Sequence, residues 1–535
     1  MTDAFDADLA IVGLGPVGAT AANLAHAHGL TAVAFDRAPA VEPRPRAIGF
    51  DQEAMRTFGG LGLGDALAPH VMPYRPSEYR NLHGQVIKRI DTAPPPHPLG
   101  WAPNYVFLQP ELEKALRHNL TGAGGVDVRL GTTVTDVRAD GEGATVGTVD
   151  EAGRRRTVRV RYVLACDGGA SGIRSRAGLS LRDLEFDEPW LVVDVLLHPG
   201  AGEELPRTNV QYCEPARPST YVVGPGRLRR WEMMINKDED PSGMTEPRVV
   251  RALLSRWLDP GDYDLWRASA YRFHALVLRQ WRAGRLFFLG DAAHMTPPFL
   301  AQGMCQGIRD ASNLVWKLAA HRHGGAGDGL LDTYQREREP HVLQVTATAK
   351  ELGRIICERD EVAAAARDAT LLAELAAQPR GTVRQSLIPG IHAGFLAADG
   401  SPARGGILPQ PRVTDSQGRS GLLDEFTGDA FRLVLGEDAD LAAAESALRA
   451  HEAAGGFPVR LVPLRRFDGP VHRGAYREEV PVLGPWLRAH GCEAVLARPD
   501  HYVFGGAQRA AEISELLAAA RRRWSSPSSP GTVVE

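Results

Sequence analysis

The residues with the clearest chemical meaning form a glycine-rich turn near the start of the chain. Gly13, Gly15 and Gly18 follow an apolar run at residues 9–12 and open an alanine-rich segment typical of a helix. Glycines at this spacing let a backbone turn tightly and approach a pyrophosphate, which the amides and dipole of the helix N-terminus stabilise. Asp36 ends the next apolar run, where a carboxylate can bind a ribose hydroxyl. The pattern predicts a dinucleotide site rather than an ordinary turn, and the predicted site also includes Pro16, Val17 and Arg37.

Two later segments, residues 163–174 and 290–304, each contain a glycine next to an aspartate. The apolar run at 286–289 that precedes the second segment is typical of a buried strand. A helix is predicted from about residue 303 to residue 319, because apolar residues recur there on one helical face. Trp316 lies in this helix, and we expect it to pack in the core.

These three segments, in this order, resemble the class A FAD-dependent aromatic hydroxylases. They are single-component monooxygenases of the 4-hydroxybenzoate hydroxylase and phenol hydroxylase type. The resemblance implies FAD as the cofactor. It implies that Asp167 and Gly168 lie near the flavin pyrophosphate. It also implies that Gly290 and Asp291 bind ribityl and phosphate oxygens of FAD.

Shorter segments agree with this resemblance. Residues 45–51 resemble the family's arginine-containing segment that contacts FAD, which assigns Arg46 to the cofactor site. Residues 108–113 resemble its glutamine-bearing helix start, with Gln109 toward the cofactor. Within the family, the nearest resemblance is to the 3-(3-hydroxyphenyl)propionate hydroxylases. It suggests a phenolic substrate of that acid type.

The resemblance implies hydroxylation of an aromatic ring with O₂ and with NADH or NADPH, between which the sequence does not decide. The reaction needs a peroxide at the flavin C4a atom, protected from water, and a ring made electron-rich, usually as a phenolate. Pro298 lacks an N–H donor, and in the family the carbonyl of this proline lies near the reacting face. The amides of Gly303 and Met304, at a helix start, are expected to stabilise negative charge on reduced flavin.

Several side chains could prepare the phenol, and the sequence leaves the choice open. Tyr271 lies on the strand predicted before the Gly290 segment and can donate a hydrogen bond to a substrate oxygen. Gln211, Tyr221 and His274 are alternatives from the same predicted sheet, although each could be an ordinary polar residue of an amphipathic strand. His294 is a further catalytic candidate, but we favour a role in fixing the loop around the cofactor.

A run of arginines, Arg227, Arg229 and Arg230, could attract an acidic group on the substrate. Because a run of charge is usually a solvated turn, we favour that interpretation.

Composition narrows the class of protein. A chain of 535 residues with 44% hydrophobic and 24% charged residues should form two or three globular domains. A net charge of −4 without a basic cluster argues against a nucleic-acid partner, and no apolar run suggests a membrane span. The five cysteines are scattered, so neither a disulfide framework nor a metal site is expected. We expect a reduced, cytoplasmic enzyme that acts on a small aromatic substrate as a homodimer.

The predicted fold is α/β, or α+β over the whole chain. A doubly wound FAD-binding domain of glutathione-reductase type is expected at 1–180, with strands near 77–90 joining the sheet of the next domain. An antiparallel-sheet substrate domain follows at 181–280, and the chain returns to the FAD-binding domain at 281–395. A thioredoxin-like domain is expected at 396–524, before a disordered tail at 525–535.

The C-terminal domain is expected to be structural. Its alternating strands and helix, at residues 431–435, 438–451, 459–462 and 493–500, resemble the thioredoxin-like domain of phenol hydroxylase-type enzymes. Dithiol chemistry needs two cysteines, and Cys492 is the domain's only one. An interaction or dimer-supporting role is therefore favoured.

Alternative functions remain open. A tailoring hydroxylase for a larger aromatic natural product would have the same motifs, and a non-oxygenase flavoprotein is less favoured. A flavin-dependent halogenase is disfavoured because the Trp-x-Trp-x-Ile-Pro signature is absent. A binding protein that has lost its flavin is disfavoured because every glycine of the fingerprint is present.

Overall fold

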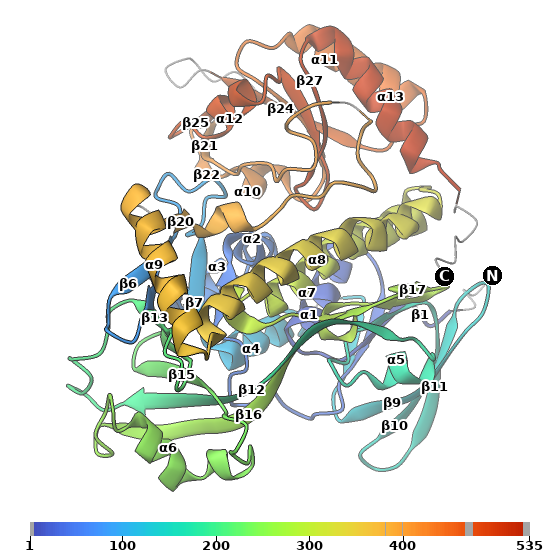
Figure 1. Cartoon of the computed structure of the whole chain (residues 1–535). Helices are drawn as coiled ribbons and strands as arrows, with labels where there is room; N and C mark the ends of the chain where they lie inside the picture. The colour runs from blue at the N-terminus through green and yellow to red at the C-terminus, as the bar shows by residue number, and fades with distance from the viewer. Residues whose placement is uncertain (1–4, 123, 380, 399, 466–473, 528–535) are drawn as a thin grey trace.

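The structure is a computed structural model that describes residues 5–122, 124–379, 381–398, 400–465 and 474–527 (Figure 1). These residues form an α/β body with two large sheets and a C-terminal body, drawn orange to red in Figure 1. Among the described residues, no helix is long and apolar enough to cross a membrane.

The first sheet belongs to the predicted FAD-binding domain. Its strands are β1 (Ala7–Val12), β2 (Ala32–Phe35), β8 (Val126–Arg129), β9 (Thr132–Ala139), β10 (Ala144–Asp150), β11 (Arg155–Ala165), β17 (Arg282–Ala283) and β18 (Leu286–Phe288). The order is β17-β18-β11-β1-β2-β8, and the pairs from β18 to β8 are parallel. Strands β9 and β10 add an antiparallel hairpin beside β11.

Helices cover this sheet. They are α1 (Pro16–Ala27), α2 (Gln52–Gly60), α3 (Gly64–Leu67), α4 (Gln109–Asn119), α5 (Gly172–Arg176), α7 (Gly303–His323) and α8 (Gly329–Cys357), beside a small sheet of β3 (Gly49–Asp51), β4 (Val71–Pro73) and β7 (Asn104–Phe107). Helix α1 begins with Pro16, which suits a first turn that needs no N–H donor, and its alanines allow close packing. Its buried side chains share one core with strands of the sheet and with α7.

The second sheet is the predicted substrate domain. Its strands are β5 (Ser77–Arg80), β6 (Val86–Asp91), β12 (Leu181–Leu197), β13 (Asn209–Tyr212), β14 (Ser219–Val223), β15 (Leu228–Met234), β16 (Tyr263–Leu278), β19 (His294–Met295) and β20 (Thr382–Val383). The order is β19-β16-β12-β15-β14-β13-β5-β6-β20, so β5 and β6 join it as the sequence predicts. Strands β19 and β20 also join it, although the sequence assigns their residues to the return of the FAD-binding domain. Helix α6 (Pro247–Leu254) covers one face, and α9 (Glu361–Ala377) packs beside β6.

The C-terminal domain has its own sheet, in the order β22-β21-β25-β24-β23-β26-β27. Its elements are β21 (Arg412–Asp415), β22 (Ser420–Leu422), α10 (Leu423–Thr427), β23 (Phe431–Leu435), α11 (Leu441–Ala453), β24 (Val459–Arg465), β25 (Tyr476–Glu478), α12 (Leu483–Ala489), β26 (Ala494–Ala497), β27 (Val503–Ala507) and α13 (Ile513–Trp524). Strand β23 pairs with β24 in parallel and with β26 antiparallel. The mixed sheet agrees with the predicted alternation of strands and helices, and the thioredoxin-like assignment stays a prediction.

The first residues of the predicted disordered tail, 525–527, are ordered. The carbonyl of Ser526 accepts a hydrogen bond from the Gly329 amide at 3.3 Å, so residues 525–527 lie against the start of α8. The rest of the tail, 528–535, lies outside the described residues.

The C-terminal domain meets the α/β body through buried charges. The Arg498 guanidinium lies 2.7 Å from the carboxylate of Glu337 on α8, and Lys317 on α7 lies 2.8 Å from the same carboxylate. Arg56 on α2 binds Asp424 of the C-terminal domain at 2.6 Å. Trp316 packs its ring at this interface against Phe395 and Phe431, so its predicted core role becomes a contact between domains.

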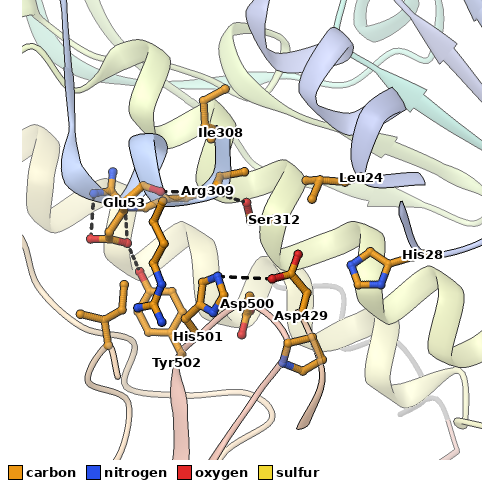
Figure 2. Close-up of a pocket in the computed structure, with 14 residues that line it drawn as sticks. Leu24, His28, Glu53, Ile308, Arg309, Ser312, Asp429, Asp500, His501 and Tyr502 are labelled. Atoms are coloured by element: carbon orange, nitrogen blue, oxygen red, sulfur yellow. Dashed lines mark hydrogen bonds and ion pairs between the residues drawn. The ribbon is translucent and has the colours of Figure 1, made fainter. Parts of the chain in front are cut away.

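A small polar cavity also lies at this interface (Figure 2). Its volume of about 30 Å³ holds about one water molecule. The Tyr502 hydroxyl donates to Glu53 at 3.0 Å beside it, and Glu53 pairs with Arg309 at 2.9 Å. The cavity is therefore part of the domain contact, away from the predicted chemistry.

Candidate active site

The predicted cofactor residues come together at one edge of the first sheet. Strands β1, β2, β11 and β18 run parallel, so their carboxyl ends meet at the same edge. The segments that follow these strands carry the predicted residues Gly13, Asp36, Asp167 and Gly290. Such an edge, outside the carboxyl ends of parallel strands, is where open α/β sheets bind ligands.

The residues at this edge fit an FAD molecule. A Cβ atom added to Gly15, Gly168 or Gly303 would meet nothing within 4 Å, so the backbone there faces open space. Helices α1 and α7 both begin at this edge without a side-chain cap, which leaves amides available to an anion. The Asp291 side chain is solvent-accessible but deep among protein atoms, and this burial raises the pKa of its carboxyl. These features suit a deep cleft that binds a pyrophosphate and polar chain oxygens.

Other glycines of the motifs are required for packing. A Cβ on Gly18 would lie 1.8 Å from the Gly13 carbonyl oxygen, and one on Gly13 would lie 2.4 Å from the Cys166 carbonyl oxygen. A Cβ on Gly307 would lie 2.4 Å from the Val17 side chain. The close approach of α1, β11 and α7 therefore depends on glycine, and Val17 serves that packing.

Three predicted cofactor residues bind protein groups around the cleft. The Asp36 carboxylate accepts from the Leu14 amide at 2.8 Å. Gln109 accepts from the amides of Arg46 and Ala47 at 2.8 and 2.6 Å, so it shapes the Arg46 segment.

The third, Asp167, accepts from the Ser171 hydroxyl at 2.6 Å and fixes the turn that carries Gly168. Arg174 then donates to the carbonyls of Gly169 and Ala292, at 2.5 and 2.9 Å. This arginine joins the second and third motifs, a link that the sequence did not reveal.

His294 is buried and fixes its loop. Its Nε2 atom lies 2.7 Å from the Asp310 carboxylate, and its ring packs on Trp281 at 5.1 Å between centroids. The same carboxylate accepts from the Gly290 amide at 3.0 Å. This arrangement supports the favoured role in loop geometry. Pro298 begins the 3₁₀ turn η4 (Pro298–Leu300), half-buried beside the start of α7.

The preferred interpretation of the arginine run is wrong for Arg230. Its side chain is buried and binds Asp194 through Nε at 2.7 Å and through Nη2 at 3.0 Å. Its Nη1 atom donates to the Arg46 carbonyl at 2.7 Å, and Arg267 donates to the Pro45 carbonyl. The pair therefore holds the Arg46 segment against the second sheet. Its partner Asp194 is distant in sequence, which hid this role.

The register of the second sheet shows which predicted substrate residues share a face. Tyr271 pairs with Trp190 of β12, and Trp190 packs on Phe299, next to Pro298, at 5.7 Å. Gln211 is buried on this same face, where it accepts from Thr220 at 2.5 Å. We call this the inner face, because it contacts the Arg46 segment and η4.

Two candidates lie on the opposite face. Tyr221 is buried under α6 and packs on Trp231 at 5.0 Å between ring centroids. His274 alternates away from Tyr271 on β16 and lies 3.3 Å from the Asp187 carboxylate. The structure therefore does not bring Tyr221 or His274 to the inner face.

The inner face also carries Glu232, which the sequence analysis did not select. Glu232 pairs with Val192 and Thr220 in the middle of the sheet. Alternation along β15 places it with Arg230 and opposite Trp231, a signal available in the sequence. The sequence did not indicate which face of the sheet meets the cofactor edge.

Comparisons with known proteins agree with this geometry. A model of the FAD binding domain matches residues 6–349, and a model of the HcaD C-terminal domain matches residues 405–523. The chain belongs to the FAD binding domain family.

Two relatives within this family are close over most of their length. The chain is 38% identical over 531 residues to a probable NADH-specific resorcinol 4-hydroxylase of Rhodococcus jostii (strain RHA1), covering 98% of this chain and 97% of the relative. It is 32% identical over 512 residues to 3-(3-hydroxy-phenyl)propionate/3-hydroxycinnamic acid hydroxylase 2 of Burkholderia vietnamiensis (strain G4 / LMG 22486), covering 92% of each. The predicted class A hydroxylase type and its FAD cofactor are confirmed.

Solved structures agree on the fold. The flavin-dependent monooxygenase PieE, in complex with FAD and substrate, matches with a TM-score of 0.81 at 22% identity over 97% of this chain and 99% of that one. Aklavinone-11 hydroxylase, with FAD and aklavinone, matches with a TM-score of 0.77 at 22% identity over 98% of this chain and 100% of that one.

Proposed function

We propose that this enzyme hydroxylates a phenol held between the FAD cleft and the inner face, at the expense of NADH or NADPH. The observation that carries the proposal is that protein contacts join the inner face to the segments that border the FAD cleft. Arg230 and Arg267 fasten the inner face to the Arg46 segment, and Trp190 packs on η4 at its other end. FAD, when bound, would accept a hydride from NAD(P)H and activate O₂.

We propose that the backbone of the cleft holds the cofactor and that few side chains are needed. The amides that start α1 bind the pyrophosphate, and Asp36 and Asp291 accept hydrogen bonds from hydroxyls. The amides of Gly303 and Met304 at the start of α7 would stabilise negative charge on the cofactor. Pro298 would offer a rigid backbone carbonyl to the bound cofactor.

Tyr271 is our proposed hydrogen-bond donor to the substrate. Its hydroxyl oxygen accepts from the Arg267 guanidinium, so its own hydrogen is available to a phenolic oxygen. Arg267 also lies over the Tyr271 ring, with its guanidinium carbon 5.0 Å from the centroid. The positive charge beside the tyrosine makes it a better donor to a developing phenolate.

The substrate classes to test follow from the relatives' names. One class is a neutral phenol of the resorcinol type, and another is a phenolic acid of the 3-(3-hydroxyphenyl)propionate type. A larger aromatic natural product is the alternative that the fold relatives suggest.

The decisive experiment is a substrate panel with purified, FAD-loaded protein. Each phenol is scored by stimulated oxidation of NADH and of NADPH, and by the mass of the product. We expect at least one phenol to stimulate oxidation and to gain one oxygen atom. If no phenol in any of the three classes does either, the proposed function is wrong.

The homodimer and the cytoplasmic location predicted from the sequence are also proposals. Size-exclusion chromatography with light scattering should give twice the monomer mass, and cell fractionation should recover the protein with cytoplasmic markers. A monomer in solution, or recovery in another fraction, would contradict the respective proposal.

A further inference from the structure

Glu232 lies at the centre of the inner face, between the two places where this face meets the cofactor edge. Along β12, the row with Trp190 and Tyr271 contacts η4, and the row with Asp194 and Arg230 contacts the Arg46 segment. Glu232 pairs with Val192, in the row between them. Alternate residues of a strand lie about 7 Å apart, so Glu232 stands one such step along the sheet from each of the two rows.

The Glu232 carboxylate has no hydrogen-bond donor among the described residues. Its side chain is only 12% exposed, and its nearest basic atom, Arg230 Nη1, lies 3.8 Å away. That nitrogen already donates to the Arg46 carbonyl, and Asp194 occupies the other side of the guanidinium. A buried carboxylate normally receives several hydrogen bonds, so this one is free to bind a ligand that donates.

The charges around Glu232 balance without any contribution from a substrate. Arg230 and Arg267 carry two positive charges on the inner face, and Asp194 and Glu232 carry two negative ones. Burial is the main cause that raises the pKa of Glu232, Asp194 raises it further, and the two arginines oppose the shift.

Charged groups of the segments that face this sheet, the Arg46 segment and residues 290–304, do not contact Glu232. Arg44 pairs with Glu42 at 2.8 Å. Arg46 acts on Asp291 in the cofactor cleft. In the 290–304 segment, His294 is held by the Asp310 carboxylate, and Asp291 lies in the cofactor cleft.

We propose that Glu232 accepts the phenolic proton of the substrate and makes the site select neutral phenols over aryl acids. This inference rests on the proposed function. In the step, the phenol O–H bond breaks, an O–H bond forms on the Glu232 carboxylate, and the electron pair stays on the phenolic oxygen. Tyr271 donates a hydrogen bond to that oxygen, and the ring becomes electron-rich.

Selection follows from the same charge balance. An aryl carboxylate would add a negative charge beside Glu232, and both arginines on this face are already bound by protein oxygens. Like charges at short range in a poorly solvated site disfavour binding. A phenol with a second hydroxyl, in contrast, brings another donor.

The test compares the holoenzyme with its Glu232→Gln variant. Glu214→Gln is the matched control, because the Glu214 side chain is also 12% exposed but is paired with Arg256, just beyond the end of β13. For a neutral dihydroxybenzene, kcat/KM of Glu232→Gln should fall about 10²- to 10⁴-fold, as expected for loss of a general base. The control should keep wild-type values.

The pH dependence separates a base from a residue that only shapes the site. Only the carboxylate accepts a proton, so wild-type kcat/KM should fall as the pH drops through the raised pKa of Glu232. The variant should lose this acid limb. Retention of the limb and of the rate in Glu232→Gln would overturn the proton-acceptor role.

Binding without turnover tests selection. Anaerobic titration of the oxidised holoenzyme, without NAD(P)H and followed by flavin absorbance, gives the Kd of a neutral phenol and of a matched phenolic acid. The wild type should bind the neutral phenol more tightly, and Glu232→Gln should reduce this preference at least about tenfold, as removal of a like charge worth about 1.4 kcal/mol predicts. An unchanged preference would overturn the selection. If the wild type neither binds nor hydroxylates any phenol, the proposed function itself fails.

Discussion

Two groups of buried charges in this molecule differ in how their carboxylates are bound. At the domain interface, Glu337 accepts from Arg498, Lys317 and Asn313, each at 2.7–2.8 Å, and these contacts hold its pKa low, at about 2, against the effect of burial. On the inner face, Glu232 has no such donor, and burial raises its pKa.

The difference separates a structural role from a functional one. A fully bonded buried carboxylate fixes the geometry between two elements, and removing it leaves its partners uncompensated. A buried carboxylate that receives no hydrogen bond costs stability, because nearby positive charge only partly offsets its loss of solvation. Its presence beside a cofactor cleft is explained when a ligand supplies the missing donor.

The largest expected effect tests whether the inner face meets a flavin at all. Gly15→Val should abolish FAD retention, because the side chain would enter the open space beside the α1 N-terminus. The backbone of Gly15, with φ −67°, accepts valine, so the protein should still fold. Flavin absorbance after purification measures the effect.

Gly141→Val is the control, since an added Cβ there also meets nothing within 4 Å but lies on the exposed β9–β10 turn. A folded Gly15→Val protein with full flavin occupancy would show that the cleft is assigned wrongly.

The same chemical change at the two carboxylates should have unequal consequences for the free energy of unfolding. Glu337→Gln should destabilise the protein by about 3–5 kcal/mol, because Lys317 would stay buried without a counter-charge and Arg498 would keep only Asp500. Glu232→Gln should change stability by less than about 1 kcal/mol, since no hydrogen bond is lost. Urea-unfolding midpoints of the two variants measure the contrast, and equal losses would contradict the distinction drawn between the groups.

Tyr271→Phe should reduce the rate of oxygen transfer, by a smaller factor than Glu232→Gln reduces kcat/KM. Losing a charge-assisted hydrogen bond of roughly 1.5–3 kcal/mol should slow oxygen transfer by about one to two powers of ten. Flavin reduction should suffer less, so NAD(P)H oxidation should continue with release of hydrogen peroxide in place of product. The ratio of peroxide to product measures this.

Tyr221→Phe, on the opposite face, is the matched control and should stay coupled. An unchanged product-to-NAD(P)H ratio in Tyr271→Phe would remove Tyr271 from the proposal.

The smallest effect is expected in the C-terminal domain. Cys492→Ser should leave turnover unchanged, because no disulfide joins the cysteines of the described residues and Cys492 is the only cysteine of this domain. Steady-state turnover with the best phenol checks it. A large loss would give this domain a redox role.

The motifs that the structure brings to the cofactor edge could be recognised in the sequence, since each is a local backbone feature that follows a strand. Gly15 could be selected from the spacing of the glycines, and Gly168 and Gly303 from motifs that resemble those of the family. The strands and helices of 1–180 could be predicted for the same reason, because hydrophobic period and turn residues are local signals.

The inner face could not be predicted, because it depends on register and on distant partners. Arg230 resembled part of a solvated charge run until β12 brought Asp194 beside it. Tyr221 and Gln211 were equally plausible until the pairing of β13 with β14 placed them on opposite faces. Strand alternation shows which residues share a face, but only the packing of α6 shows which face it covers.

The most direct test of the account is the pH profile of hydroxylation by wild type and Glu232→Gln. The measurement is kcat/KM for product formed from a neutral dihydroxybenzene, with product mass confirmed at each pH. The account predicts an acid limb in the wild type that Glu232→Gln lacks, together with a rate lower by about two powers of ten or more. Identical profiles and rates would contradict it.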